Sequence, residues 1–191
     1  MIIQIIIIIL LLFISYKLFH DCNINTIQFK NIILHNEICT YKGEIHSKLL
    51  NLFDFEDKKQ YNILEIGAGN GKSTETFLKE LNNKKINYIY SICEYDNNYK
   101  KSLDNFKSNG NIKDIYYSKW EDINNNSYDI IFLTSFSTLN ENNIESFKKL
   151  LTKESYVITL SYFYKKDKLQ YFNIISQKNH GLLKLFLLTI K

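Results

Sequence analysis

Apolar residues follow two patterns along the chain. Residues Ile2–Ile14 are apolar at every position except Gln4, and Leu18 and Phe19 extend that run. From about Asn62 onward, short stretches rich in β-branched and aromatic residues alternate with segments of helical periodicity. Alternation of this kind predicts a mostly parallel sheet with helices on both of its faces.

Seven strands and three main helices are predicted in this second part. The strands are Asn62–Ile66, Tyr88–Cys93, Ile112–Tyr117, Tyr128–Leu133, Tyr156–Tyr162, Tyr171–Ile175 and Leu182–Ile190. The helices are Ser73–Leu81, Asn98–Lys107 and Glu141–Leu151. A short turn at Asn179-His180-Gly181 joins the last two strands, which must be antiparallel because a parallel connection needs a longer crossover. We therefore expect an α/β fold with a doubly wound, mostly parallel seven-stranded sheet that ends in an antiparallel strand pair.

The N-terminal apolar run predicts a transmembrane anchor over residues 1–20. Eighteen residues that rise about 1.5 Å each span about 27 Å, close to the roughly 30 Å of a bilayer's hydrocarbon core. A cleaved signal peptide would want a charged start and a small-residue cleavage site, which this run lacks. A buried core helix is the third interpretation, and isoleucine on every face argues against it. Lys17, Lys30 and Lys42 lie on the C-terminal side, which favours a single-pass membrane protein with a cytoplasmic body.

Composition and charge limit the binding partners that the sequence predicts. The 191 residues are enough for one domain with one sizeable core. There is no Arg, so all 24 basic residues are Lys, and the net charge is +4. Lys attracts anionic surfaces but lacks the planar fork that specific recognition favours, so specific nucleic-acid binding is not expected. Cys22, Cys39 and Cys93 are widely spaced and have no His in metal-ligand spacing, so neither a disulfide framework nor a metal site is predicted.

A glycine-rich turn follows the first strand of the predicted sheet. The sequence Glu65-Ile66-Gly67-Ala68-Gly69-Asn70-Gly71 leads into a helix opened by Lys72-Ser73-Thr74. Glycines let the backbone adopt positive φ and approach a ligand closely, and a helix N-terminus offers N–H groups to a negative group. A phosphate-binding P-loop does not fit, because its first Gly would fall at Ile66. The dinucleotide motif GxGxxG does not fit either, because its third Gly would fall on Lys72.

The observed spacing is GxGxG with an acid two residues before the first Gly. A second acid, Glu94, ends the next predicted strand 23 residues after Gly71, where a carboxylate can accept hydrogen bonds from both hydroxyls of a ribose. Together these features closely resemble class I methyltransferases. The resemblance implies a Rossmann-like methyltransferase fold with S-adenosylmethionine as cofactor. The residues that it places at this cofactor are Glu65, Gly67, Ala68, Gly69, Gly71 and Glu94.

The segment after the third strand departs from the family pattern. In such enzymes this region borders the adenine, and here it reads Lys119-Trp120-Glu121-Asp122. Trp120 either stacks on the adenine or packs in the core. The acid usual in this region would align near Ser118-Lys119, and Glu121 or Asp122 is expected to substitute for it.

The segment after the fourth strand is Thr134-Ser135-Phe136-Ser137. The resemblance implies that substrate and methyl donor meet at Thr134, although consecutive hydroxyl residues also form turns. Asp129, at the start of that strand, is expected to face structure and not substrate. The domain division is then a transmembrane anchor at residues 1–20, a linker with N-terminal helices at 21–60, and a methyltransferase domain at 61–191. A helix over Gly43–Phe53 is expected to pack over the cofactor edge.

The order of these features resembles bacterial-type phospholipid N-methyltransferases from Ile63 to the C-terminus. The shared parts include the cofactor loop, the acid Glu94, an aromatic fifth strand at Leu160–Tyr164 and a final strand pair preceded by an Asn-containing turn at Asn179. The resemblance implies a lipid acceptor with an amino headgroup, and an anchor would raise the effective concentration of lipid at the site. A chain without Pro cannot carry the Asn/Asp-Pro-Pro-aromatic tetrad of many nucleobase methyltransferases. A membrane-tethered small-molecule or thiol methyltransferase, a non-catalytic binding protein of the same fold, and RNA or protein methylation stay open as alternatives.

Overall fold

The computed structural model describes residue 12 and residues 22–23, 40–41, 43–57, 59–124, 128–133, 139–161, 169–180 and 183–191. The predicted transmembrane anchor at residues 1–20 therefore lies outside the described residues, apart from Leu12, which is helical and exposed. Among the described residues, no helix combines the length and the apolar character needed to cross a membrane.

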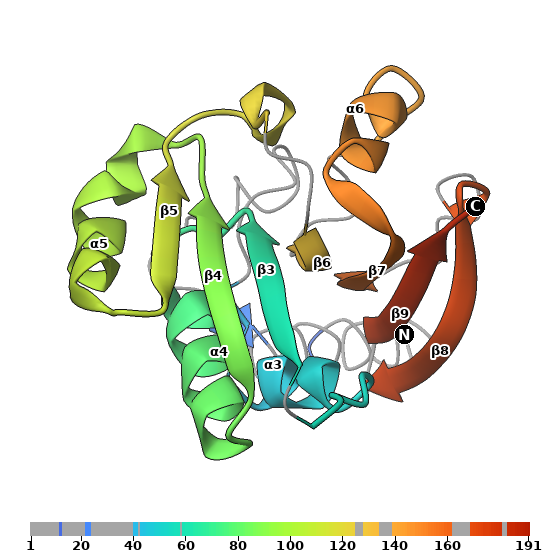
Figure 1. Ribbon diagram of the computed structural model, residues 1–191, viewed down its shortest axis with the longest axis horizontal. Coiled ribbons are helices and arrows are strands. Elements are labelled where there is room, and N and C mark those ends of the chain that lie inside the picture. The colour runs from blue at the N-terminus through green and yellow to red at the C-terminus, as the bar shows by residue number, and fades with distance from the viewer. Residues whose placement is uncertain are drawn as a thin grey trace, which may run out of the picture.

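Seven strands form one mixed sheet (Figure 1). They are β3 (Gln60–Ile66), β4 (Asn87–Cys93), β5 (Ile112–Tyr116), β6 (Tyr128–Leu133), β7 (Leu151–Ser161), β8 (Phe172–His180) and β9 (Leu183–Ile190). Their order across the sheet is β5-β4-β3-β6-β7-β9-β8. The first five pair in parallel, whereas β9 pairs antiparallel with both β7 and β8. The predicted sheet, with its antiparallel C-terminal pair, is confirmed. A separate two-stranded ribbon joins β1 (Cys22–Asn23) to β2 (Thr40–Tyr41).

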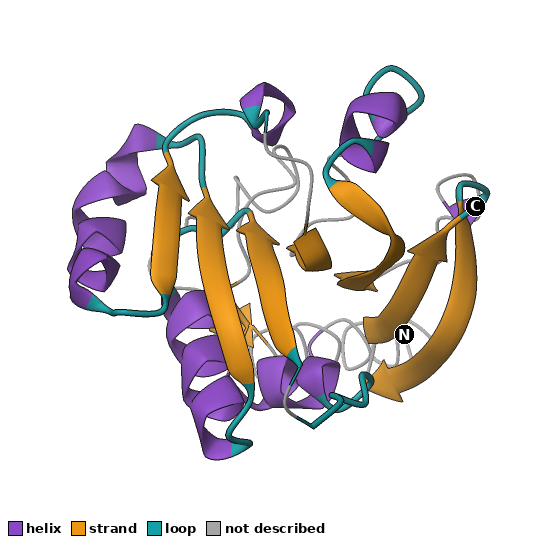
Figure 2. Cartoon of the chain, viewed as in Figure 1, coloured by secondary structure: helices purple, strands orange, loops and turns teal. Residues whose placement is uncertain are grey.

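Helices cover both faces of the sheet (Figure 2). The helical segments are α3 (Gly43–Leu50), α4 (Lys72–Asn83), η1 (Asn97–Tyr99), α5 (Lys100–Asp104), η2 (Asn105–Ser108), η3 (Trp120–Asp122) and α6 (Ile144–Lys148). Successive side chains of a strand point to opposite faces, so β3 contributes to two cores. Ile63 belongs to the cluster that contains Leu50 of α3 and Phe77 of α4. Leu64 belongs to the cluster that contains Phe147 of α6.

One predicted helix is divided in the structure and another is shorter, because short polar side chains near their N-terminal ends form local turns. The predicted helix 98–107 is divided into η1, α5 and η2, and the Asp96 carboxylate accepts a hydrogen bond from the Asn98 N–H at 2.9 Å. The predicted helix 141–151 is reduced to α6. There Asn140 and Asn143 exchange side-chain and backbone hydrogen bonds, with Asn143 Oδ1 2.8 Å from the Asn140 nitrogen. Short polar side chains of this kind compete with helical hydrogen bonds.

Two further expectations are corrected. The predicted turn at residues 179–181 begins too early, because β8 continues through His180, which pairs with Leu183. The strand was hard to recognise because β8 is the edge of the sheet, and its polar residues 176–179 resemble a loop. The helix α3 does not cover the carboxyl ends of the strands; it contacts α4 and β7 and lies beside the start of β3 (Figure 1).

Candidate functional site

The glycine loop follows β3, the strand at which the order of strands across the sheet changes direction. β3 lies between β4, which follows it in sequence, and β6, which follows after the excursion to β5 at the sheet edge. In open α/β sheets, ligands bind outside the carboxyl ends of the strands at such a switch point. The topology therefore places the loop and the end of β4 at the expected ligand-binding edge.

All three glycines of the loop adopt the left-handed conformation that favours glycine. Their φ angles are 80° at Gly67, 55° at Gly69 and 86° at Gly71. The Gly67 N–H donates to the Cys93 carbonyl oxygen at 2.9 Å, which holds the start of the loop against the end of β4. Ala68, between the first two glycines, is buried.

The glycines at the two later positions serve different purposes. A Cβ on Gly71 would lie 2.5 Å from Cε2 of Phe106 in η2, so this glycine lets the loop pack closely. A Cβ on Gly69 would meet no atom within 4 Å. Gly69 thus borders open space, and α4 begins directly after Gly71.

The Glu94 carboxylate joins the end of β4 to the loop. Glu94 is only 6% exposed, and its Oε2 accepts a hydrogen bond from the Gly69 N–H at 2.8 Å. Its Oε1 accepts a second hydrogen bond from the Asp96 N–H at 2.9 Å. Each carboxylate oxygen has two lone pairs, so both can accept a further hydrogen bond from a ligand hydroxyl.

Glu65 lies near the end of β3, just before the loop, and is fully buried. Its Oε2 accepts hydrogen bonds from Thr74 Oγ1 at 2.6 Å and from the Tyr90 hydroxyl at 3.0 Å. Its Oε1 has no hydrogen-bond partner among the residues that the structure describes. Burial raises the pKa of Glu65, the nearby hydroxyls oppose that shift, and the negative charge of Glu94 adds to it. The two predicted acids thus flank one loop, and the more buried acid has an oxygen available to a hydrogen-bond donor.

Trp120 and Glu121 contact α6. The Trp120 ring is 6% exposed and lies edge-to-face on Phe147, with ring centroids 5.6 Å apart. The exposed Glu121 accepts a hydrogen bond from Asn143 Nδ2 at 3.2 Å. The Trp120 side chain thus packs against Phe147 of α6. Thr134 lies outside the described residues.

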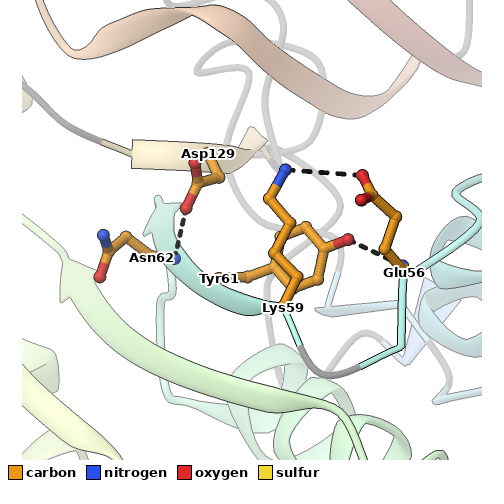
Figure 3. A network of polar contacts seen from close by, with 5 residues as sticks. All are labelled: Glu56, Lys59, Tyr61, Asn62 and Asp129. Carbon is orange, nitrogen blue, oxygen red and sulfur yellow. Dashed lines mark hydrogen bonds and ion pairs between the residues drawn. The ribbon is translucent and has the colours of Figure 1, made fainter.

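Asp129 belongs to a network at the opposite end of the strands (Figure 3). Its Oδ2 accepts a hydrogen bond from the Asn62 N–H at 2.8 Å and so joins the start of β6 to β3. Nearby, the Tyr61 hydroxyl accepts from the Glu56 N–H at 2.8 Å, and Lys59 Nζ lies 3.6 Å from Glu56 Oε1. The prediction that Asp129 faces structure is confirmed.

Three residues near the loop were not predicted as site residues. Thr74 and Tyr90 contact Glu65. In the sequence, the residues around them indicated only a helix and a strand. Tyr95 directly follows Glu94 and is 60% exposed, which is unusual for a large aromatic side chain. An aromatic residue placed next to a strand-end acid is the signal that would have identified it.

The strand order, the glycine loop and the acid after β4 define the class I methyltransferase fold. No protein-family model matches the sequence, and no curated protein matches it at a significant level. Solved structures do match. They include the ribosomal protein L11 methylase of Lactobacillus delbrueckii subsp. bulgaricus, with a TM-score of 0.58, 14% identity and coverage of 78% of this chain and 77% of that one.

Two further matches have a TM-score of 0.57. One is the 1,6-didemethyltoxoflavin-N1-methyltransferase of Burkholderia thailandensis, solved with 1,6-didemethyltoxoflavin and S-adenosylhomocysteine, at 9% identity over 78% of this chain and 77% of that one. The other, from Listeria monocytogenes, is assigned to the class I S-adenosylmethionine-dependent methyltransferases and is 14% identical over 78% of this chain. The present chain spans 58% of that protein's length. Similarity at this level establishes the fold.

Proposed function

We propose that the chain is an S-adenosylmethionine-dependent methyltransferase whose cofactor binds at the carboxyl edge of β3 and β4. The observation that carries this proposal is the hydrogen bond from Gly69 to Glu94, because it joins the carboxylate that we expect to bind the ribose to the glycine loop. The unpartnered oxygen of Glu65 also fits the cofactor, since a buried carboxylate oxygen requires a donor and the cofactor carries a cationic amino group. The fold shared with the Burkholderia enzyme supports the same ligand class.

Different residues of the chain bind different parts of this cofactor in the proposed complex. The backbone of Gly67, Ala68, Gly69 and Gly71 borders it, and Glu94 accepts hydrogen bonds from the ribose hydroxyls. The exposed ring of Tyr95 supplies a face for the adenine. The further residues that the sequence predicts at the cofactor are Trp120, Glu121 and Thr134.

The bound cofactor supplies a methyl group on a sulfonium. Transfer of such a group depends mainly on holding a neutral nucleophile in line with it, and much less on acid–base machinery. The glycine loop and Glu94 hold one reaction partner at the switch point of the sheet. A pair of catalytic acids or bases is therefore not required for the proposed reaction.

We further propose that the acceptor is the amino headgroup of a membrane phospholipid. The apolar run Ile2–Ile14 supports this proposal, because an anchor at the bilayer would keep the site close to its substrate. A small-molecule acceptor is the second candidate. The structural neighbour that favours it is the Burkholderia enzyme, whose structure contains 1,6-didemethyltoxoflavin.

Cofactor use is tested by calorimetric titration of the full chain in detergent micelles. We expect saturable heat with S-adenosylmethionine and with S-adenosylhomocysteine. Absence of heat with both ligands, in a sample whose circular dichroism shows folded protein, would refute the methyltransferase proposal.

The acceptor is tested separately with cofactor labelled in its methyl group. The protein is incubated with liposomes that contain phosphatidylethanolamine, and with matched liposomes of phosphatidylcholine only. We expect label in the organic phase of the first sample. Label in neither organic phase would exclude the lipid acceptor, and labelled product in an aqueous extract of small amines or thiols would select the second candidate.

A further inference from the structure

The two carboxylate oxygens of Glu65 have different surroundings. Oε2 accepts hydrogen bonds from the hydroxyls of Thr74 and Tyr90, at 2.6 and 3.0 Å. Oε1 is buried and has no hydrogen-bond partner among the described residues. Within the same part of the chain, none of the salt bridges involves Glu65. One oxygen is thus held by two donors, and the other has none among the described residues.

We propose that Thr74 and Tyr90 are positioning residues for the cofactor: their hydroxyls fix one oxygen of Glu65 so that the other accepts a hydrogen bond from the cationic amino group of the cofactor. This inference rests on the function proposed above. The two hydroxyls come from different elements, α4 and β4, and Glu65 itself lies on β3. The orientation of its carboxylate therefore depends on the packing of all three elements beneath the loop.

The hydroxyls also favour the ionised form of Glu65. A buried carboxylate without donors tends to become neutral, and a neutral acid would lose its attraction for a cationic group. Burial raises the pKa of Glu65, whereas the hydroxyls of Ser73, Thr74 and Tyr90 lower it. Tyr90 remains a donor because its own pKa lies well above the ordinary value for tyrosine, first through burial and then through the charge of Glu65.

The ionisable groups around Glu65 do not stabilise its negative charge in place of the hydroxyls. On β4 they are Tyr88 and Tyr90. Glu94 directly follows β4, and its charge raises the pKa of Glu65. On α3, His46 packs edge-to-face on Phe77 of α4, and burial lowers the pKa of this histidine to about 4, so it is neutral at pH 7. The described neighbours of Glu65 thus include hydroxyl donors but no paired cation.

The chain contains a matched control for each positioning residue. Tyr88 lies two residues before Tyr90 on β4 and is also buried, but its hydroxyl donates to Asn82 Oδ1 at 3.0 Å. Thr76 lies two residues after Thr74 on α4, and its hydroxyl donates to the Lys72 carbonyl oxygen at 3.0 Å. Neither control hydroxyl contacts Glu65.

The test measures the affinity of the full chain for S-adenosylmethionine by calorimetry between pH 5.5 and 8.5, with urea unfolding of each variant as a check of folding. We expect Tyr90→Phe and Thr74→Val to weaken binding by about tenfold at pH 7.5, since each removes a hydrogen bond to a charged group. Each of these two variants should also raise the pH below which the affinity for S-adenosylmethionine falls to half of its maximum. The reason is that the remaining donors stabilise the ionised Glu65 carboxylate less well. Tyr88→Phe, Thr76→Val and the conservative Thr74→Ser should bind as the unmodified protein does.

The outcomes separate this inference from the function on which it rests. If the unmodified protein binds neither S-adenosylmethionine nor S-adenosylhomocysteine, the proposed function fails. If the unmodified protein binds but Tyr90→Phe and Thr74→Val keep its affinity and its pH profile, only the positioning roles are overturned. Equal losses in the variants and in their matched controls would likewise overturn them. Glu65→Gln gives an independent measure: weak binding with a flat pH profile supports the inference, and unchanged affinity contradicts it.

Discussion

The backbone N–H of Gly69 donates a 2.8 Å hydrogen bond to the Glu94 carboxylate, so the loop after β3 and the end of β4 form one structural unit. The backbone N–H of Asp96 donates to the other oxygen of the same carboxylate. Glu94 is therefore held in position before any ligand arrives, and a preorganised acceptor loses less free energy when it binds. Because its oxygens also contact the loop, a change at Glu94 is expected to alter both ligand binding and loop conformation.

Replacing Glu94 by Ala should weaken binding of S-adenosylmethionine by about 1.5–3 kcal/mol, the range for hydrogen bonds to a charged group. Calorimetric titration measures the loss directly. Glu145→Ala is a suitable control, because Glu145 lies on the exposed side of α6 in an ion pair with Lys148. Unchanged affinity in Glu94→Ala would refute the ribose-binding role.

Replacing Gly71 by Ala should destabilise the fold by about 2 kcal/mol, because φ is +86° and the new Cβ would meet Phe106. Urea unfolding of three variants separates these two causes. Gly69→Ala has the positive φ but no clash, so its loss should be smaller, and Gly110→Ala has neither and should be nearly neutral. Equal stability of all three variants would contradict this explanation.

Stability should fall in mild acid because of His46. Burial lowers the pKa of this histidine to about 4, whereas in the unfolded chain it titrates near 6.5. Between pH 4 and pH 6.5, His46 is protonated in the unfolded chain but not in the folded one. The free energy of unfolding is therefore highest above pH 6.5 and decreases as the pH falls toward 4. The expected loss is about 3 kcal/mol. Urea unfolding at pH 7 and pH 4.5 should show a smaller decrease in the free energy of unfolding for His46→Leu than for the unmodified protein. Equal decreases in both proteins would exclude His46 as the cause.

Replacing Trp120 by Phe should lower stability by about 1–2 kcal/mol, because the indole ring packs on Phe147 in a buried cluster. Cofactor affinity should change much less than stability, since this side chain faces α6. Thermal unfolding and calorimetry on the same samples give both values. A large loss of affinity at unchanged stability would instead assign the Trp120 ring to the adenine.

Local features of the sequence predicted most of the parallel sheet correctly. The strand Tyr128–Leu133 is apolar at every position except Asp129, and the structure has β6 with the same bounds. Edge and boundary elements were harder, because their conformation depends on partners distant in sequence. β8 extends through its polar residues only because β9 pairs with them, and the predicted helix 141–151 ends early because Leu151 pairs with Tyr128 in the sheet.

The sequence by itself determined the glycine loop and the acid Glu94, because both depend on short spacings and on the conformational freedom of glycine. Tertiary structure alone decided how the acids are used. Thr74 and Tyr90 reach Glu65 from nine and 25 residues away, and Glu94 reaches Gly69 across 25 residues. Packing of β3, β4 and α4 creates these contacts, and the burial that accompanies packing shifts the pKa of Glu65. A hydrophobic pattern identifies the strands but does not specify which hydroxyl meets which carboxylate.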